Sequence, residues 1–95
     1  MKISRLQAYI REHDCNPENF NGYFLKLIEE AGELATAINE DLVVEKGSEF
    51  EGSVNEELFD VMYYVLAIAN CYGIDMEECA HTKLKINAEK YGRCV

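Results

Sequence analysis

Apolar residues recur along most of this chain at steps of three and four, which is the spacing of one face of an α-helix. A first such segment runs from about Lys2 to His13. A second begins at Asn16-Pro17, a cap residue followed by proline at the first helical position, and extends to about Glu40. Because no segment shows convincing strand alternation, the pattern predicts an all-α protein.

Two further helices are predicted after a polar, acidic loop from about Asp41 to Gly52. Ser53 and Glu56 have the spacing of a capping box, so we expect a third helix from Ser53 to about Tyr72. This helix has a wide apolar face and should be central. Asp75 resembles the cap of a fourth helix, which reaches about Tyr91.

The fold expected from these segments is a four-helix bundle-like domain that spans residues 1–95. A domain of this size buries only a modest fraction of its surface, yet 48% of its residues are hydrophobic. Part of this apolar surface should therefore be covered by another subunit, which predicts a homo-oligomer.

The chain is strongly acidic, with a formal net charge of −9 from 18 acidic and 9 basic residues. Such a protein repels nucleic-acid backbones and anionic membranes, so neither is an expected partner, whereas a nucleotide can still bind through cations. No apolar run is long enough to span a bilayer. No secretory signal precedes the four cysteines, which are Cys15, Cys71, Cys79 and Cys94. We therefore expect a cytoplasmic protein with free thiols.

Acidic residues are concentrated in residues 29–60, where eleven acids accompany one base. Two pairs in this stretch have the three-residue spacing that places both side chains on one helix face: Glu30 and Glu33, and Glu57 and Asp60. If the second and third helices pack antiparallel, these four side chains, here called the carboxylate quartet, face one another and repel strongly without a cation. Oxygen ligands suit Mg²⁺ or Mn²⁺, so the quartet predicts a divalent-metal site for a phosphorylated substrate.

Either pair alone is typical of a solvated helix surface, but the local sequence around each pair favours a functional site. Glu30 and Glu33 flank Ala31-Gly32, and the other pair lies within an otherwise apolar helix. A glycine inside a helix costs about 1 kcal/mol relative to alanine. Gly32 therefore needs a reason, which is either tight packing against another helix or the approach of substrate.

The segments around both pairs resemble the motifs of the MazG-like nucleoside triphosphate pyrophosphohydrolases, an all-α family. Residues 27–34, Leu-Ile-Glu-Glu-Ala-Gly-Glu-Leu, are similar to its first motif, and residues 56–61, Glu-Glu-Leu-Phe-Asp-Val, to its second. Lys83, Asn87 and Tyr91 match a K-x-x-x-N-x-x-x-Y pattern on the last helix. The resemblance covers nearly the whole chain and extends in particular to the short integron-associated MazG-like proteins and the dCTP pyrophosphatases.

This resemblance implies that the protein hydrolyses a (deoxy)nucleoside triphosphate to the monophosphate and pyrophosphate. It implies Mg²⁺ on the quartet, with Mn²⁺ as a substitute, and phosphate contacts from Lys83 and Asn87. Tyr64 would line the nucleotide pocket, unless it is a core tyrosine, and Tyr91 would cap that pocket or stack on a sugar. Such enzymes are homodimers or homotetramers. The suggested substrates are dCTP, dATP or modified dNTPs, in a house-cleaning role.

Two questions stay open from the sequence. The general base could be one carboxylate of the quartet or the adjacent Glu29 or Glu56. The alternative functions are a non-catalytic helical module that binds a nucleotide or a protein, and a purely structural acidic bundle. All four predicted ligand positions are filled, which argues against a decayed site.

Overall fold

The structure is a computed structural model that describes residues 1–92, and these residues form helices and loops without a strand. The order is α1 (Ile3–His13), η1 (Pro17–Asn19), α2 (Phe20–Asn39), η2 (Val44–Lys46), α3 (Val54–Tyr72) and α4 (Met76–Tyr91), where η1 and η2 are short 3₁₀ helices. The all-α prediction is confirmed. In the described part of the chain, no helix has the length and apolar character to cross a membrane.

Three of the four cysteines lie in the described residues, and all three, Cys15, Cys71 and Cys79, are free thiols. Cys94 lies outside the described residues.

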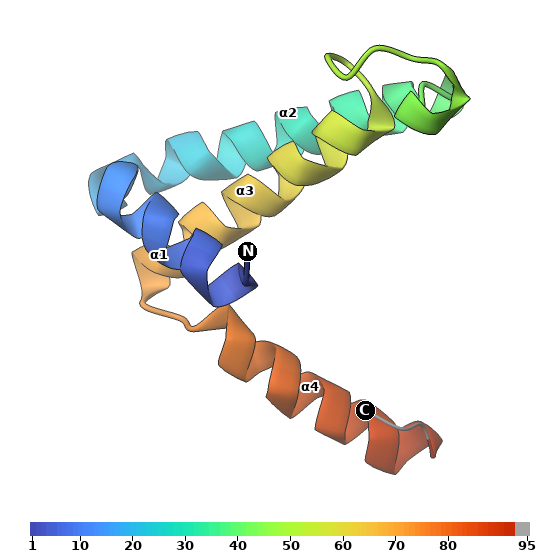
Figure 1. The fold of residues 1–95 in the computed structure, drawn as a ribbon. Coiled ribbons are helices and arrows are strands. Elements are labelled where there is room, and N and C mark those ends of the chain that lie inside the picture. The colour runs from blue at the N-terminus through green and yellow to red at the C-terminus, as the bar shows by residue number, and fades with distance from the viewer. Residues whose placement is uncertain (93–95) are drawn as a thin grey trace.

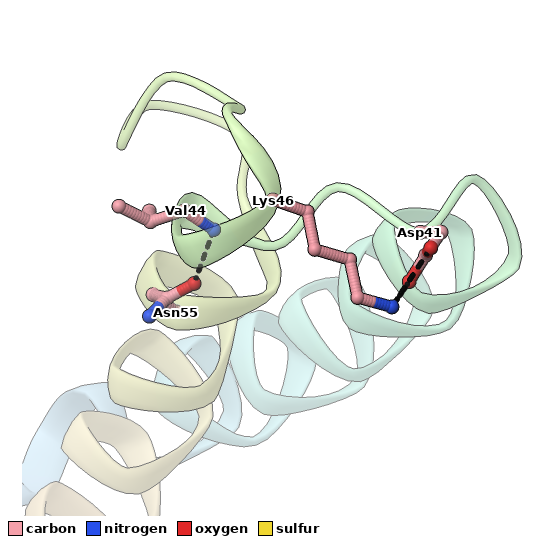
Figure 2. A network of polar contacts seen from close by, with 4 residues as sticks. All are labelled: Asp41, Val44, Lys46 and Asn55. Atoms are coloured by element: carbon pink, nitrogen blue, oxygen red, sulfur yellow. Dashed lines mark hydrogen bonds and ion pairs between the residues drawn. The ribbon is translucent and has the colours of Figure 1, made fainter.

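Helices α2 and α3 form an antiparallel hairpin with the main helix–helix contact of the fold (Figure 1). The loop between them is fastened at two points, which Figure 2 shows. Lys46 Nζ lies 2.8 Å from Asp41 Oδ1, and the Val44 N–H donates to Asn55 Oδ1 on the first turn of α3 at 3.0 Å. The second bond ties the loop to the first turn of α3, whereas the Lys46–Asp41 pair is exposed on both sides and lies within the loop.

The first turn of α3 is capped as the sequence predicts, with one difference. Ser53 Oγ accepts a hydrogen bond from the Glu56 N–H at 3.2 Å. The Glu56 side chain reaches back to the Gly52 N–H at 2.9 Å, one residue before the position expected in a capping box. Both bonds satisfy donors at the helix start, immediately before Glu57.

The core lies where α1 crosses the second half of α3 (Figure 1). Its buried apolar members are Leu6, Ile10, Tyr23, Leu66 and Ala67. A buried polar contact accompanies them, because Gln7 Nε2 donates to Asn70 Oδ1 at 3.1 Å and Asn70 Nδ2 donates back to the Gln7 carbonyl at 3.1 Å. This core anchors α1 at the end of the hairpin that is opposite the α2–α3 loop.

Helix α4 does not close a four-helix bundle within one chain, which corrects the sequence prediction. It projects away from the hairpin (Figure 1) and buries none of its residues. Leu84 and Ile86 are each about half exposed. The radius of gyration is 15.5 Å, against about 13 Å for a compact domain of 100 residues. The α4 start is held by α1, since the Met76 N–H donates to Gln7 Oε1 at 3.1 Å.

Candidate metal and nucleotide site

The α2–α3 hairpin brings the two predicted carboxylate pairs to one place. Oxygen atoms of Glu30, Glu57 and Asp60 lie within 4.8 Å of one another, and so do oxygen atoms of Glu29, Glu30 and Glu33. Glu30 belongs to both groups and therefore joins the α2 pair to the α3 pair. The structure places the members of the quartet on facing sides of the two helices, as their spacing predicts.

Burial raises the pKa of several of these carboxyl groups. Glu30 is only 7% exposed. Its burial, followed by the neighbouring Glu33 and Glu57 carboxyls, raises its pKa to about 7. Burial also raises the pKa values of Glu57 and Asp60, and the negative charge of Glu33 adds to both effects. Glu30 is thus only partly ionised near neutral pH unless positive charge is supplied to it.

Two atoms of this site are buried without a hydrogen-bond partner in the described structure: Glu30 Oε2 and Glu57 Oε2. Buried polar groups normally have partners, and an orphaned carboxylate oxygen is costly. Clustered carboxylate oxygens are also the ligands that hard divalent cations prefer. The residues present therefore fit a divalent metal ion.

Gly32 lies between the two glutamates of α2 and faces open space. Apart from its chain neighbours and the backbone of its own helix turn, a Cβ atom built on it would meet no atom within 4 Å. Tight packing against another helix of the same chain, one of the two reasons predicted for this glycine, is therefore wrong within the described protomer. The other predicted reason, the approach of substrate, stays a prediction.

Lys26 is a site residue that the sequence reasoning missed. Its Nζ lies 3.4 Å from Glu29 Oε2 and 3.6 Å from Glu30 Oε1, and 6.0 Å from the centre of the Tyr64 ring. The position of Lys26 four residues before Glu30 was the available signal, because side chains at this spacing are neighbours on a helix.

A cavity of about 470 Å³ adjoins Lys26 at the start of α2. Its lining residues are Asp14, Asn19, Gly22, Tyr23, Leu25, Lys26 and Tyr64. One lining residue, Asp14, is held in place because its two carboxylate oxygens accept hydrogen bonds from the Tyr23 and Tyr63 hydroxyls at 3.0 and 2.7 Å. Tyr64 is thus a partly buried residue that lines a cavity beside the quartet.

The two carboxylates considered as alternative general bases differ in their surroundings. The Glu56 side chain is engaged in the α3 cap through Gly52. Glu29 is exposed and lies with Glu30 and Glu33 in one group of oxygen atoms. Of the two, Glu29 is the one whose oxygen atoms group with quartet carboxylates, while the charge of Glu56 acts on Glu57 and Asp60 and raises their pKa values.

The α4 residues expected to bind substrate are not brought to the quartet within one chain. Lys83 lines a separate cavity of about 450 Å³ between α4 and the turn that precedes it. The Tyr91 ring has Lys90 Nζ at 5.3 Å from its centre, and Asn87 lies on the same projecting helix. A complete site with these residues would require α4 from another copy of the chain.

Comparisons with known proteins identify the family of this chain. The MazG nucleotide pyrophosphohydrolase domain matches residues 18–91. A crystal structure of iMazG from Vibrio DAT 722 is 44% identical, covers 98% of this chain and 100% of its own, and superposes with a TM-score of 0.86. A second iMazG structure from the same source is 44% identical, covers 92% and 98% of the two chains, and has a TM-score of 0.83. The comparison with curated proteins returned no match.

Proposed function

The chain belongs to the MazG nucleotide pyrophosphohydrolase family and is a nucleoside triphosphate pyrophosphohydrolase, and we propose that its carboxylate quartet is the metal site of this reaction. The observation that carries the proposal is the pair of orphaned atoms, Glu30 Oε2 and Glu57 Oε2, buried between facing carboxylates. Mg²⁺ is the proposed ion, with Mn²⁺ as a substitute, because both take carboxylate oxygens as ligands.

The reaction adds water across the α–β phosphoanhydride bond of the nucleotide. The water oxygen ends on a phosphorus atom, the anhydride bond breaks, pyrophosphate leaves, and a proton passes to a carboxylate. When bound, Mg²⁺ supplies charge neutralisation for the phosphates and polarises water. We assign proton acceptance to Glu29, because Glu56 is held in the α3 cap and Glu29 lies beside the ligand carboxylates.

We further propose that the active form is a homodimer or a homotetramer in which α4 of one copy supplies Lys83 and Asn87 to the quartet of another. The projecting α4 leaves its apolar side chains exposed, and Leu25, Ile28 and Leu58 on the hairpin are each more than half exposed. Charge also supports this pairing, since α4 carries three lysines and residues 29–60 carry most of the acids.

Substrate recognition is proposed to involve Tyr64 and the adjoining cavity, with Tyr91 at the edge of the assembled site. The cavity is large enough for part of a small ligand. The resemblance to dCTP-hydrolysing enzymes favours dCTP, dATP or modified dNTPs. We infer a cytoplasmic house-cleaning role in the nucleotide pool, without nucleic acid or membrane as a partner.

The direct test is pyrophosphate release from a panel of common and modified dNTPs, with Mg²⁺ and with a chelator. We expect turnover that requires the metal and is lost in Glu57→Gln. Glu45→Gln, an exposed glutamate in the α2–α3 loop, is the matched control and should keep the wild-type rate. The metal-site proposal fails if Glu57→Gln is as active as the wild type, or if a chelator has no effect.

A further inference from the structure

A nucleoside triphosphate brings several negative charges to a site that is itself rich in carboxylates. The site must therefore offer cationic groups to the phosphates, beyond any metal that it holds. Among residues 1–92, Lys26 alone forms ion pairs with carboxylates at this site. The question is whether its ammonium group has a structural role or one toward substrate.

The contacts of Lys26 are those of a weakly held side chain. Its side chain is 44% exposed, and that of its nearer partner, Glu29, is 54% exposed. Both N–O distances, 3.4 and 3.6 Å, are longer than those of strong charged hydrogen bonds. The Lys26–Glu29 pair is exposed on both sides and contributes little to folding, and the longer pair reaches a Glu30 side chain that is only 9% exposed. Stabilisation of helix α2 therefore does not explain why a lysine stands at position 26.

The position of Lys26 is informative, because it lies between two parts of the site. It is one helical turn before Glu30 on α2 and lines the cavity that also includes Asn19, Gly22 and Tyr64. Lys26 thus touches both the cavity and, through its 3.6 Å contact with Glu30, the quartet. The lysine stem is flexible, and its three N–H donors can exchange a carboxylate for a phosphate oxygen.

We propose that Lys26 is a phosphate-binding residue of this enzyme, whose ammonium group turns from Glu29 and Glu30 to the phosphate chain of the bound nucleotide. This inference rests on the proposed function of the quartet. It assigns the phosphate contact to the same chain that supplies the four carboxylates. The release of Glu29 from Lys26 in this exchange leaves that carboxylate available as a proton acceptor.

The test compares Lys26→Gln and Lys26→Arg with Lys46→Gln in the full-length protein. Lys46 is a matched control, because it is an exposed lysine in an ion pair with Asp41 in the loop. Inorganic tripolyphosphate has the phosphate chain without a base, so its binding, measured by calorimetry with Mg²⁺ present, isolates phosphate recognition. The KM and kcat for dCTP and the melting temperature complete the set.

We expect Lys26→Gln to weaken tripolyphosphate binding and to raise the KM for dCTP by roughly 10-fold or more, the usual effect of losing a hydrogen bond to a charged group. Lys26→Arg should recover part of both. Lys46→Gln should match the wild type, and all melting temperatures should stay close together. Unchanged tripolyphosphate binding in Lys26→Gln overturns the proposal. It is also overturned if the melting temperature of Lys26→Gln falls far enough for unfolding to explain the weaker tripolyphosphate binding.

Failure of this inference can be told apart from failure of the proposed function. If the wild type does not hydrolyse any dNTP, the quartet proposal fails, while tripolyphosphate binding still reports on Lys26. If the wild type hydrolyses dCTP and Lys26→Gln behaves like Lys46→Gln, only the Lys26 proposal fails. A wild type that binds no tripolyphosphate also overturns it.

Discussion

Glu30 on α2 and Glu57 on α3 lie together across the hairpin, and each has its Oε2 atom buried without a hydrogen-bond partner in the described structure. Two acidic side chains in such a place destabilise the metal-free fold, because burial removes solvation and like charges repel. This arrangement lowers the stability of the metal-free fold and provides a site that a cation can occupy.

Replacing Glu57 with glutamine should therefore stabilise the metal-free protein. The neutral amide removes one buried charge and can donate to Glu30, which we expect to raise the free energy of unfolding by on the order of 1–3 kcal/mol at pH 8. The same change should abolish the rise in melting temperature that Mg²⁺ produces in the wild type by binding the folded state. Thermal melts with EDTA and with a Mg²⁺ series measure both effects.

The control for this prediction is Glu45→Gln, which removes an equal charge from the exposed loop. It should leave both the metal-free melting temperature and the Mg²⁺ response close to those of the wild type. A Glu57→Gln protein that melts at a lower temperature than the wild type in EDTA would show that Glu57 stabilises the fold, contrary to this reading.

The stability of the metal-free protein should depend on pH through Glu30. Its pKa is raised from 4.5 to about 7 by burial and by the neighbouring carboxyls. Between these values the folded state keeps a proton that the unfolded chain has released, so this group's contribution to stability is full below pH 4.5 and is lost as the pH rises to about 7. Glu30→Gln should remove the effect.

The measurement is the difference in melting temperature between Glu30→Gln and the wild type, taken in EDTA across this range. The difference should grow in favour of the variant from about pH 4.5 to about pH 7 and then level off. A difference that stays constant across the range contradicts a raised pKa for Glu30. Mg²⁺ binding by the wild type should strengthen over the same interval, because metal and proton compete for the carboxylate.

Much of the site could be predicted because it depends on local spacing. The three-residue separation within each carboxylate pair fixes a shared helix face, and a short polar loop makes the two helices antiparallel neighbours. The caps at Ser53 and Asp75 are also local, and the structure shows both side chains accepting hydrogen bonds from the helix starts that follow them.

The features that could not be predicted depend on contacts between distant parts of the chain. The direction of α4 is set by the contacts of Gln7 with Asn70, Ile74 and Met76, which join α1 to residues more than 60 positions away. Amphipathic spacing shows that α4 has an apolar face, but not whether the partner of that face lies in the same chain. The spacing of Lys26 to Glu30 is local, but the cavity that Lys26 also lines is formed with Asp14 and Tyr64 from other parts of the chain.

Shared sites between subunits predict a specific result when inactive variants are mixed. Lys83→Ala and Glu57→Gln should each be inactive alone, because each removes a part of every site. After the two are unfolded and refolded together, mixed dimers should have one intact site, which restores about a quarter of the wild-type activity. If both residues act within one chain, mixing restores nothing, and the assignment of Lys83 to a second copy is wrong.

Gly32 gives an independent test of the same assembly. Leu25, Ile28, Gly32 and Ala35 follow one another at steps of three and four along the exposed side of α2. Because a Cβ at Gly32 meets nothing within one chain beyond its own helix turn, Gly32→Ala should stabilise the isolated protomer by up to about 1 kcal/mol through helix propensity alone. In the assembly, the added methyl group should instead meet the helix of the second copy and weaken subunit association.

These two effects have opposite signs and can be measured on one sample series. Sedimentation across a range of protein concentrations should show a weaker dimer for Gly32→Ala, while melts at the lowest concentration should show a raised melting temperature. Ala35→Gly, which removes a methyl group from the same exposed stripe, is the matched control and should lower the melting temperature. An unchanged association constant for Gly32→Ala would place the second copy elsewhere and leave the approach of substrate as the reason for this glycine.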